Sequence, residues 1–182
     1  MQQLIALDGQ ILLWIQEYVR QDWMNGFWTA ITRLGDGGWF WIVLSLVLLC
    51  FKRTRKAGAA GLLALAVGAL ITNVALKNLV ARIRPYEVVD GLVCLIEKQK
   101  DFSFPSGHTC ASFAAAAVYY RTLPKRYGVS ALVLAALIAL SRLYVGVHYP
   151  TDILVGFVVG LFAAWAALKL IEYMTGKRKA KL

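Results

Sequence analysis

Residues 151–174 read TDILVGFVVGLFAAWAALKLIEYM, and apolar side chains fill all but a few of these positions. A helix that crosses the hydrocarbon core of a bilayer needs about 20 mostly apolar residues. The stretch is therefore predicted to be a transmembrane helix. It follows directly on SRLYVGVHYP, residues 141–150, so a segment with an arginine and a histidine lies at the start of the predicted span.

The composition extends this prediction to the rest of the chain. Of the 182 residues, 59% are hydrophobic and 16% are charged. Soluble domains are about 45–50% apolar and about 25% charged, so this chain is too apolar to bury everything in one small core. Lipid is the expected solvent for its outer surface, and the length allows a single membrane domain.

Five apolar spans can be assigned, at 38–51, 57–79, 106–123, 127–147 and 151–174. The first is short unless residues 34–37 extend it. The predicted fold is an all-α, polytopic membrane bundle of five to six transmembrane helices over residues 34–174.

Residues 1–33 have a different pattern. Apolar side chains recur at roughly helical spacing from Leu4 to Val19, polar residues lie between them, and tryptophans add an aromatic edge. This pattern predicts one or two amphipathic helices that lie in the membrane interface. A sixth span over 9–31 is the alternative, although Glu17, Arg20 and Asp22 would each be costly near its middle.

The net charge is +10, and most of the basic residues stand in short segments between or after spans. The clusters lie at 52–56, at 121–126 and in a basic tail at 175–182. If the chain crosses five times, all three lie on one side, which the positive-inside rule assigns to the cytoplasm. The opposite, extracytoplasmic side then carries 80–105 and 142–151. This distribution indicates a multi-pass protein of the cell membrane and argues against nucleic-acid binding.

Most of the polar groups that could perform chemistry fall on that opposite side. Lys77 and Arg84 are seven residues apart, so they would share one helix face if the helix runs on to Pro85. Arg142 lies where the fourth span ends. Arg82 is a further cation there, either for a lipid headgroup or simply extending to the interface.

The third span opens with Pro105-Ser106-Gly107-His108. The amino end of a helix presents free backbone N–H groups and the positive end of the helix dipole, which suits a phosphate. Ser106 fits the N-cap position, and Gly107 allows the backbone to approach a ligand closely.

His148 and Asp152 are four residues apart at the start of the fifth span. This spacing allows the carboxylate to hold one imidazole nitrogen and leaves the other free to attack. The second histidine, His108, could protonate a leaving oxygen. Only Asp152 and Glu87 are carboxylates close to these motifs, too few for a magnesium site. We therefore expect phosphoryl-transfer chemistry without a metal or another cofactor.

Three motifs occur in order: KNLVARIRP (77–85), PSGH (105–108) and SRLYVGVHYPTD (141–152). Together they resemble the signature of the type 2 phosphatidic acid phosphatase superfamily, which includes membrane lipid phosphatases and vanadium haloperoxidases. The resemblance implies that His148 is the nucleophile that forms a phosphohistidine, that Asp152 orients it, and that His108 is the general acid. It also implies a phosphate-binding set: Lys77, Arg84, Arg142, Ser106 and Gly107.

The resemblance implies a lipid phosphatase whose substrate sits in the outer leaflet. Undecaprenyl diphosphate, converted to undecaprenyl phosphate, is the favoured substrate because the chain is compact. Phosphatidylglycerophosphate and phosphatidic acid are alternatives. A transporter or flippase that only binds a lipid phosphate is the alternative from another class. A haloperoxidase is disfavoured because those members are soluble. The oligomeric state is left open.

Overall fold

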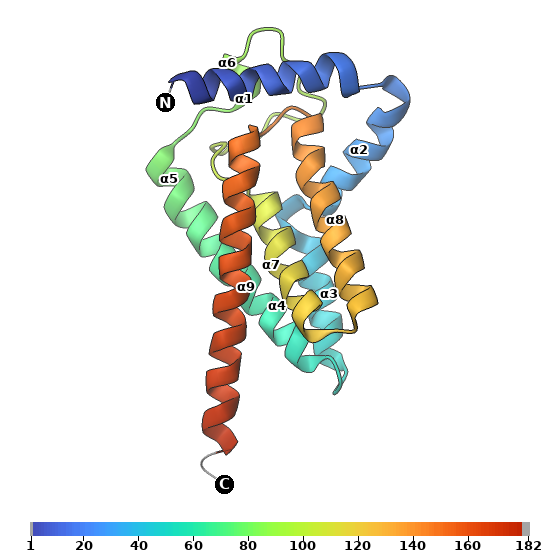
Figure 1. Ribbon diagram of the computed structural model, residues 1–182, viewed down its shortest axis with the longest axis vertical. Helices are drawn as coiled ribbons and strands as arrows, with labels where there is room; N and C mark the ends of the chain where they lie inside the picture. The colour runs from blue at the N-terminus through green and yellow to red at the C-terminus, as the bar shows by residue number, and fades with distance from the viewer. Residues whose placement is uncertain (1, 180–182) are drawn as a thin grey trace.

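Five long helices run side by side through the part of the chain that the structure, a computed structural model, describes: residues 2–179 (Figure 1). They are α3 (Trp39–Cys50), α4 (Arg55–Ala69), α7 (Gly107–Thr122), α8 (Lys125–Tyr144) and α9 (Pro150–Lys179). About 79% of the chain is helical, and the described residues form no strands. The predicted all-α class is therefore confirmed.

The helix α4 continues upward through a π-helical segment, η3 (Leu70–Leu76), into α5 (Lys77–Val80). The short α6 (Pro85–Val88) and the segment that follows it lie above the upper end of the bundle and lead into α7. This segment brings its polar residues over the start of α7 and the turn between α8 and α9.

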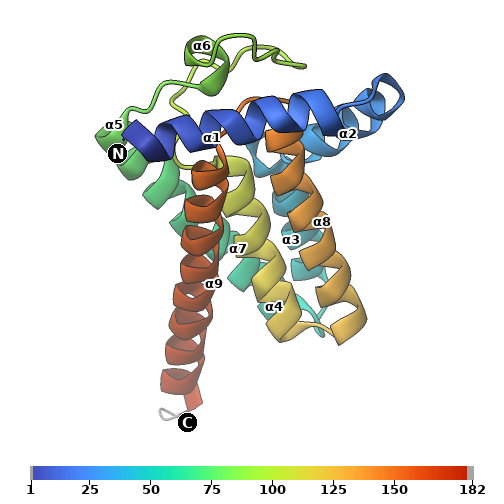
Figure 2. The ribbon, with the colours of Figure 1, turned by 45° about the horizontal axis from the view of Figure 1, so that its top comes forward.

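The amino-terminal segment forms α1 (Gln2–Trp14), a π-helical turn η1 (Ile15–Val19) and α2 (Asp22–Leu34). Figure 2 shows α1 lying across the upper ends of α8 and α9. In contrast, α2 runs downward against α8 and joins α3 through a 3-10 turn, η2 (Asp36–Gly38). The two amino-terminal helices thus differ in direction, and of the two only α2 is strongly amphipathic; their depth in a bilayer stays a prediction.

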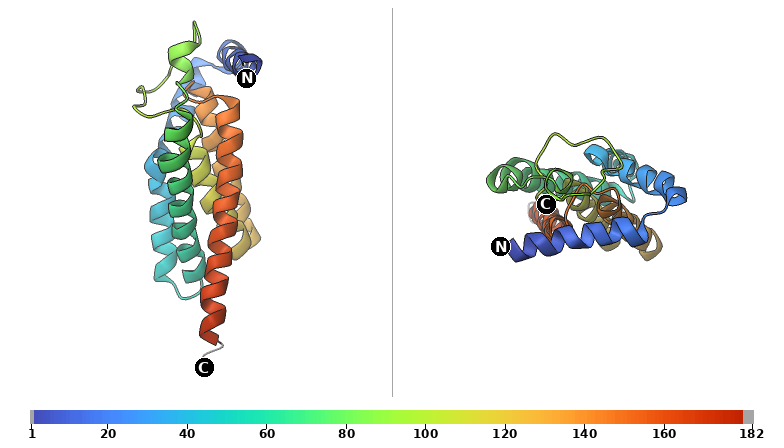
Figure 3. Two further views of the ribbon diagram at one scale, coloured as in Figure 1. Left: turned by 90° about the vertical axis from the view of Figure 1, so that its left-hand side faces the viewer. Right: turned by 90° about the horizontal axis from the view of Figure 1, so that it is seen from above.

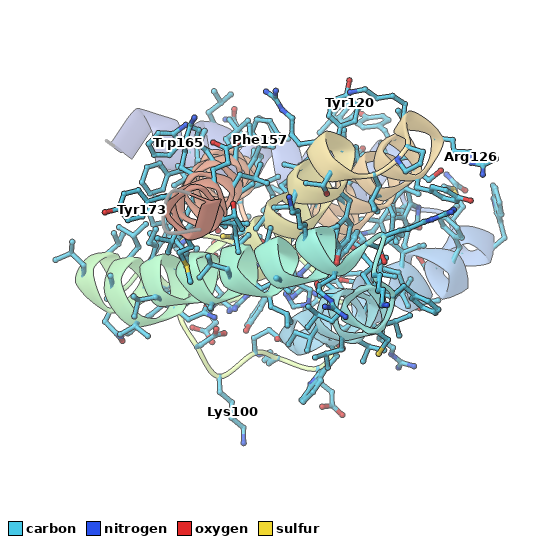
Figure 4. All side chains as sticks on the ribbon, turned by 90° about the horizontal axis from the view of Figure 1, so that it is seen from below. Lys100, Tyr120, Arg126, Phe157, Trp165 and Tyr173 are labelled. Carbon is cyan, nitrogen blue, oxygen red and sulfur yellow. The ribbon has the colours of Figure 1, made fainter. Side chains whose placement is uncertain are left out.

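The helix α7 is the centre of the bundle, in contact with α4, α8 and α9 (Figure 3). Alanines on α7 are fully buried against its neighbours, which lets the backbones come close. The opposite side of α9 presents an exposed apolar stripe, on which Trp165 and Tyr173 point away from the bundle (Figure 4). Such a stripe suits contact with lipid tails.

Within residues 2–179, three helical segments are long and apolar enough to cross a membrane: Arg55–Val88, Lys125–Tyr144 and Pro150–Gly176. The pair Asp22–Leu34 and Asp36–Cys50, bent by 45°, adds a fourth if it counts as one broken span. The predicted count of five to six is therefore not confirmed. The helix α7 has 16 residues, about 24 Å at 1.5 Å per residue, less than the hydrocarbon thickness.

The loops that carry the basic clusters 52–56 and 121–126 lie together at the lower end of the bundle, where α9 also ends. The tail predicted at 175–182 begins inside α9, which continues to Lys179; residues 180–182 lie outside the described residues. The upper end carries the segment after α6 and the turn between α8 and α9. The chain thus has one basic end and, as shown below, one end with the polar constellation.

Glycines allow α9 to pack closely on α7. A Cβ added at Gly160 would lie 2.7 Å from the carbonyl oxygen of Cys110 and 3.1 Å from the amide nitrogen of Ala114. These are backbone atoms of α7, which cannot move aside without displacing the helix. The packing role expected of such small residues in membrane helices therefore applies here.

We predict that Gly160→Ala destabilises the protein by about 1–3 kcal/mol, because the added methyl group forces α9 away from α7. Thermal unfolding in detergent measures this as a fall in the midpoint temperature. Gly176→Ala is the matched control on the same helix, since a Cβ there meets nothing within 4 Å. Equal midpoints for the two variants would contradict the close α7–α9 packing.

Candidate active site

A cavity of about 510 Å³ opens at the upper end of the bundle, and most of the predicted site residues line it. They come from the three separate motifs of the chain. The predicted residues in its wall are Lys77, Arg84, Gly107, His108, Arg142 and His148. The two others, Ser106 and Asp152, are buried behind this wall.

His148 and Asp152 meet as the spacing predicted. The Nδ1 atom of His148 lies 3.3 Å from Oδ2 of Asp152, and both side chains are buried. The same Oδ2 accepts hydrogen bonds from the Tyr149 amide at 3.0 Å and from the Ser103 hydroxyl at 2.5 Å. With Nδ1 directed to the carboxylate, Nε2 is the nitrogen on the other edge of the ring.

The environment keeps His148 neutral. Burial lowers the pKa of His148 from its ordinary 6.5 to about 3; the charges of Arg84 and Arg142 add to this lowering, whereas the hydrogen bond to Asp152 opposes it. The imidazole is therefore uncharged at neutral pH, with a lone pair available on one nitrogen. This is the protonation state that a nucleophile requires.

Arg84 lies next to that nitrogen. Its Nη1 is 3.5 Å from Nε2 of His148 and donates to the carbonyl of Val147 at 2.8 Å. The guanidinium is held on its other side by Asp101, with Nη2 2.5 Å from Oδ1 and Nε 2.9 Å from the carbonyl oxygen. A group bound to Nε2 of His148 would thus be in contact with a fixed cation.

Lys77 is brought to the same place, but not by the predicted geometry. The expectation that one helix runs from Lys77 to Pro85 is wrong: α5 ends at Val80, and Ala81 adopts a left-handed conformation with φ 47°. Arg84 is extended (φ −72°, ψ 149°), as the ring of the following proline requires. The two cations meet instead through Asp101, which forms ion pairs with both.

Arg142 is fully buried in the wall of the cavity. Its Nη1 donates to the hydroxyl of Thr32 on α2 at 2.6 Å. Its Nε and Nη2 are buried and have no hydrogen-bond partner among the described residues. Leaving a charged donor unpaired in the interior is costly, so the placement indicates that this guanidinium serves an anionic ligand.

His108 projects from the first turn of α7, and its Nε2 lies 2.9 Å from Oδ1 of Asp36. Asp36 belongs to η2, between α2 and α3. Burial, together with the charge of Arg142, lowers the pKa of His108 from its ordinary 6.5 to about 4, and the hydrogen bond to Asp36 opposes this lowering. The partner was not anticipated from the sequence, because Asp36 belongs to none of the three motifs.

Ser106 is the N-cap of α7, as predicted. Its Oγ accepts hydrogen bonds from the amide of Thr109 at 3.4 Å and from the Thr109 hydroxyl at 3.0 Å. The Ser106 side chain is therefore occupied within the helix start rather than directed into the cavity. Gly107 lines the cavity beside Asn73, so the amino end of α7 faces the cations.

Carboxylates near the site are more numerous than the expected two. Asp8, Asp36 and Asp101 each contact a motif residue or a cation beside one. Glu87 is exposed. The missed aspartates come from three segments distant in sequence, and only folding brings them here. The described residues still hold no group of three or more His, Cys, Asp or Glu side chains placed to bind a metal.

Arg82 has neither of the two roles expected for it. Its guanidinium lies 3.7 Å over the ring of Tyr149 and forms ion pairs, both at 2.8 Å, with Asp152 and with Asp8 of α1. It is therefore a mostly buried bridge behind the histidine pair. Neither a lipid headgroup nor an extended path to the interface explains these contacts.

The lower wall of the cavity is apolar. Side chains from α3 and α4 form it, namely Ile42, Leu62, Leu65, Ala66 and Ala69. Cations and histidines thus line one end of a single cavity, and aliphatic groups line the other. A ligand with an anionic head and an apolar tail matches this division.

The chain is similar in sequence and in fold to several known proteins. The undecaprenyl-diphosphatase of Sulfolobus acidocaldarius is 31% identical over 147 residues, covering 81% of this chain and 70% of the relative. Phosphatidylglycerophosphatase B of Bacillus subtilis is 35% identical over 159 residues, covering 79% and 73%. The crystal structure of Aquifex aeolicus LpxE superimposes with a TM-score of 0.78 at 25% identity, covering 88% of this chain and 93% of that one.

Residues 57–175 match the PAP2 superfamily. The matched region runs from the start of α4 almost to the end of α9, and it contains all three motifs that line the cavity. The chain is therefore a helical membrane protein that belongs to the PAP2 superfamily of phosphatases.

Proposed function

We propose that the protein is a metal-independent membrane lipid phosphatase that hydrolyses a lipid phosphate or diphosphate through a phosphohistidine. One observation carries this proposal. A single cavity joins a neutral, oriented His148 to three cations, and one of these, Arg142, has two buried guanidinium nitrogens without a hydrogen-bond partner in the described part of the chain. Fixed cations around a nucleophile stabilise the charge on the oxygens of a transferring phosphoryl group.

The proposed reaction has two steps. Nε2 of His148 attacks phosphorus; a P–N bond forms, the P–O bond to the leaving group breaks, and the leaving oxygen takes a proton from His108. Water then attacks the phosphohistidine and gives a proton to His108. The electron pair of the P–N bond returns to His148, and inorganic phosphate is released.

Positive charge develops on the imidazole of His148 during the attack, and Asp152 stabilises it because Nδ1 faces its carboxylate. Lys77, Arg84 and Arg142 neutralise the phosphoryl oxygens, with the amino end of α7 beside them. His108 is the acid in the first step and the base in the second. Asp36 supports the charged form that the first step requires.

Undecaprenyl diphosphate, cleaved to undecaprenyl phosphate, is the substrate we favour. The apolar wall built by α3 and α4 suits the start of a polyprenyl chain, and the segment 89–106 leaves little protein to recognise a large headgroup. One relative is an undecaprenyl-diphosphatase. Another is a phosphatidylglycerophosphatase, so phosphatidylglycerophosphate and phosphatidic acid are the alternative substrates.

We also propose that the site faces the extracytoplasmic side of the cell membrane. The basic loops lie at the opposite end of the bundle from the cavity, and the positive-inside rule places such loops in the cytoplasm. The substrate phosphate would then be presented from the outer leaflet, with its tail beside α3 and α4.

His148→Ala is expected to lower phosphate release at least 1,000-fold while lipid binding persists, because the variant loses the nucleophile but keeps the cations. The measurement compares the wild type and the variant in detergent against undecaprenyl diphosphate, phosphatidylglycerophosphate and phosphatidic acid, each with and without EDTA. EDTA should not reduce the rate.

The comparison of the three lipids tests which substrate the protein prefers. Faster turnover of a glycerolipid than of the polyprenyl diphosphate would overturn the favoured substrate but keep the mechanism. Transport of an intact lipid phosphate by His148→Ala, with no phosphate release by the wild type, would instead favour the transporter.

His108→Ala should lower the rate of hydrolysis of lipid phosphates about 100–10,000-fold. It should lower the rate for p-nitrophenyl phosphate far less, because nitrophenolate can leave without taking up a proton. Steady-state rates of the wild type and of the variant give the fold loss for each substrate, and the two losses are then compared. Asp36→Asn should show the same pattern to a smaller extent. An equal loss on both substrates would contradict the role of His108 as general acid.

Asp101→Asn should lower the KM for the lipid phosphate and tighten inhibition by vanadate several-fold, because the carboxylate competes with phosphate for Lys77 and Arg84. Burial raises the pKa of Asp101, but hydrogen bonds and the charges of those two cations outweigh it and lower the pKa to about 2. The competition should therefore persist in the wild type down to pH 5. A higher KM in the variant would mean that Asp101 positions the cations instead.

A further inference from the structure

Asp8 is a buried carboxylate that the proposed reaction does not use. It lies on α1, only 2% exposed, and accepts hydrogen bonds from Nη2 of Arg82 at 2.8 Å and from the amide of Thr151 at 3.3 Å. The hydroxyl of Thr151 also donates to it. Every one of these partners adjoins the nucleophile's partner, Asp152.

Arg82 connects the two aspartates. Its Nη2 faces Asp8, while its Nη1 donates to Oδ1 of Asp152 at 2.8 Å and to the Thr151 hydroxyl at 2.7 Å. Oδ2 of Asp152 is the oxygen that faces His148. Four groups therefore stand in series, Asp8, Arg82, Asp152 and His148, and only the last of them lines the cavity.

The order of charges in this series has a consequence for the nucleophile. A guanidinium bound to Oδ1 reduces the negative potential that Asp152 presents to the imidazole, where positive charge develops during the attack. In a buried site such an effect is screened far less than in water. A second carboxylate on the far side of the guanidinium cancels most of its charge.

We propose that Asp8 is a positioning residue of the active site: it holds Arg82 against Asp152 and neutralises it, so that Asp152 keeps its full charge for His148. This inference rests on the proposed phosphohistidine chemistry. It gives α1 a part in catalysis, although α1 lies outside the region matched to the superfamily.

The packing of α1 supports this role. Asp8 and Leu12 are four residues apart on α1, so they share one helix face, and Gln16 follows in η1. Leu12 is buried with Leu92 and Tyr149, and Gln16 hydrogen-bonds the backbone of the segment after α6. Contacts on both sides of Leu12 therefore hold Asp8 against Arg82.

The test compares Asp8→Asn with Glu17→Gln, a control that removes one negative charge from an exposed position of the same amino-terminal segment. We expect Asp8→Asn to lower kcat about tenfold. The KM and the vanadate inhibition constant should change less than twofold, because the cations that bind phosphate are not touched. The control should match the wild type in all three.

A second comparison tests the route through Arg82. In an Arg82→Gln background, the added Asp8→Asn should leave kcat unchanged or raise it, because no guanidinium remains to be neutralised. The double variant should also turn over faster than Asp8→Asn alone. This comparison still decides the matter if Asp8→Asn alone fails to fold.

The outcomes separate the two proposals. Wild-type turnover that does not depend on His148 would overturn the proposed function itself. His148-dependent turnover with an unchanged kcat in Asp8→Asn would overturn only the role of Asp8. A fall in kcat that is the same with and without Arg82 would also overturn it, because Asp8 would then act through some other contact.

Discussion

The carboxylate of Asp152 holds the upper end of the molecule together. Its two oxygens accept hydrogen bonds from Arg82, Ser103 and the Tyr149 amide. The backbone carbonyl of Asp152 accepts a further hydrogen bond from the amide of Ser106. The segments that lead out of α5, into α7 and into α9 therefore converge on one buried anion. An unpaired carboxylate there would be costly, and this requirement for partners fixes where the three motifs stand relative to one another. The remaining face of Asp152 is left for His148.

The cavity has an excess of positive charge that the protein compensates only in part. Asp101 faces Lys77 and Arg84, and Asp36 faces His108, whereas the side chain of Arg142 hydrogen-bonds a single hydroxyl among the residues that the structure describes. Placing three cations around a neutral imidazole is unfavourable for an isolated protein and favourable for binding a multiply charged phosphate. The helices below supply the rigid frame: α7, packed on α4 and α9 through alanine and glycine, presents its amino end to the same space.

The sequence predicted the helical class and the residues of the cavity wall because both depend on local patterns. Apolar runs reveal spans, and the spacing of His148 and Asp152 places them together within one turn. The prediction was wrong where it extended a helix past its end. Lys77 and Arg84 do not share a helix face, because Pro85 makes Arg84 extended and Ala81 ends α5. The predicted count of five to six spans is not confirmed, because α7 has only 16 residues and is enclosed by its neighbours.

By itself, the sequence determined the helical membrane class and predicted a cationic, two-histidine phosphoryl-transfer site, since hydropathy and motif spacing are properties of short segments. Only the tertiary structure decided which acidic groups serve that site. Asp8, Asp36 and Asp101 lie in a terminal helix, a tight turn and a loop, and no local pattern distinguishes them from aspartates that face water. Their roles arise because buried cations require partners, and the fold selects whichever carboxylates it brings within reach.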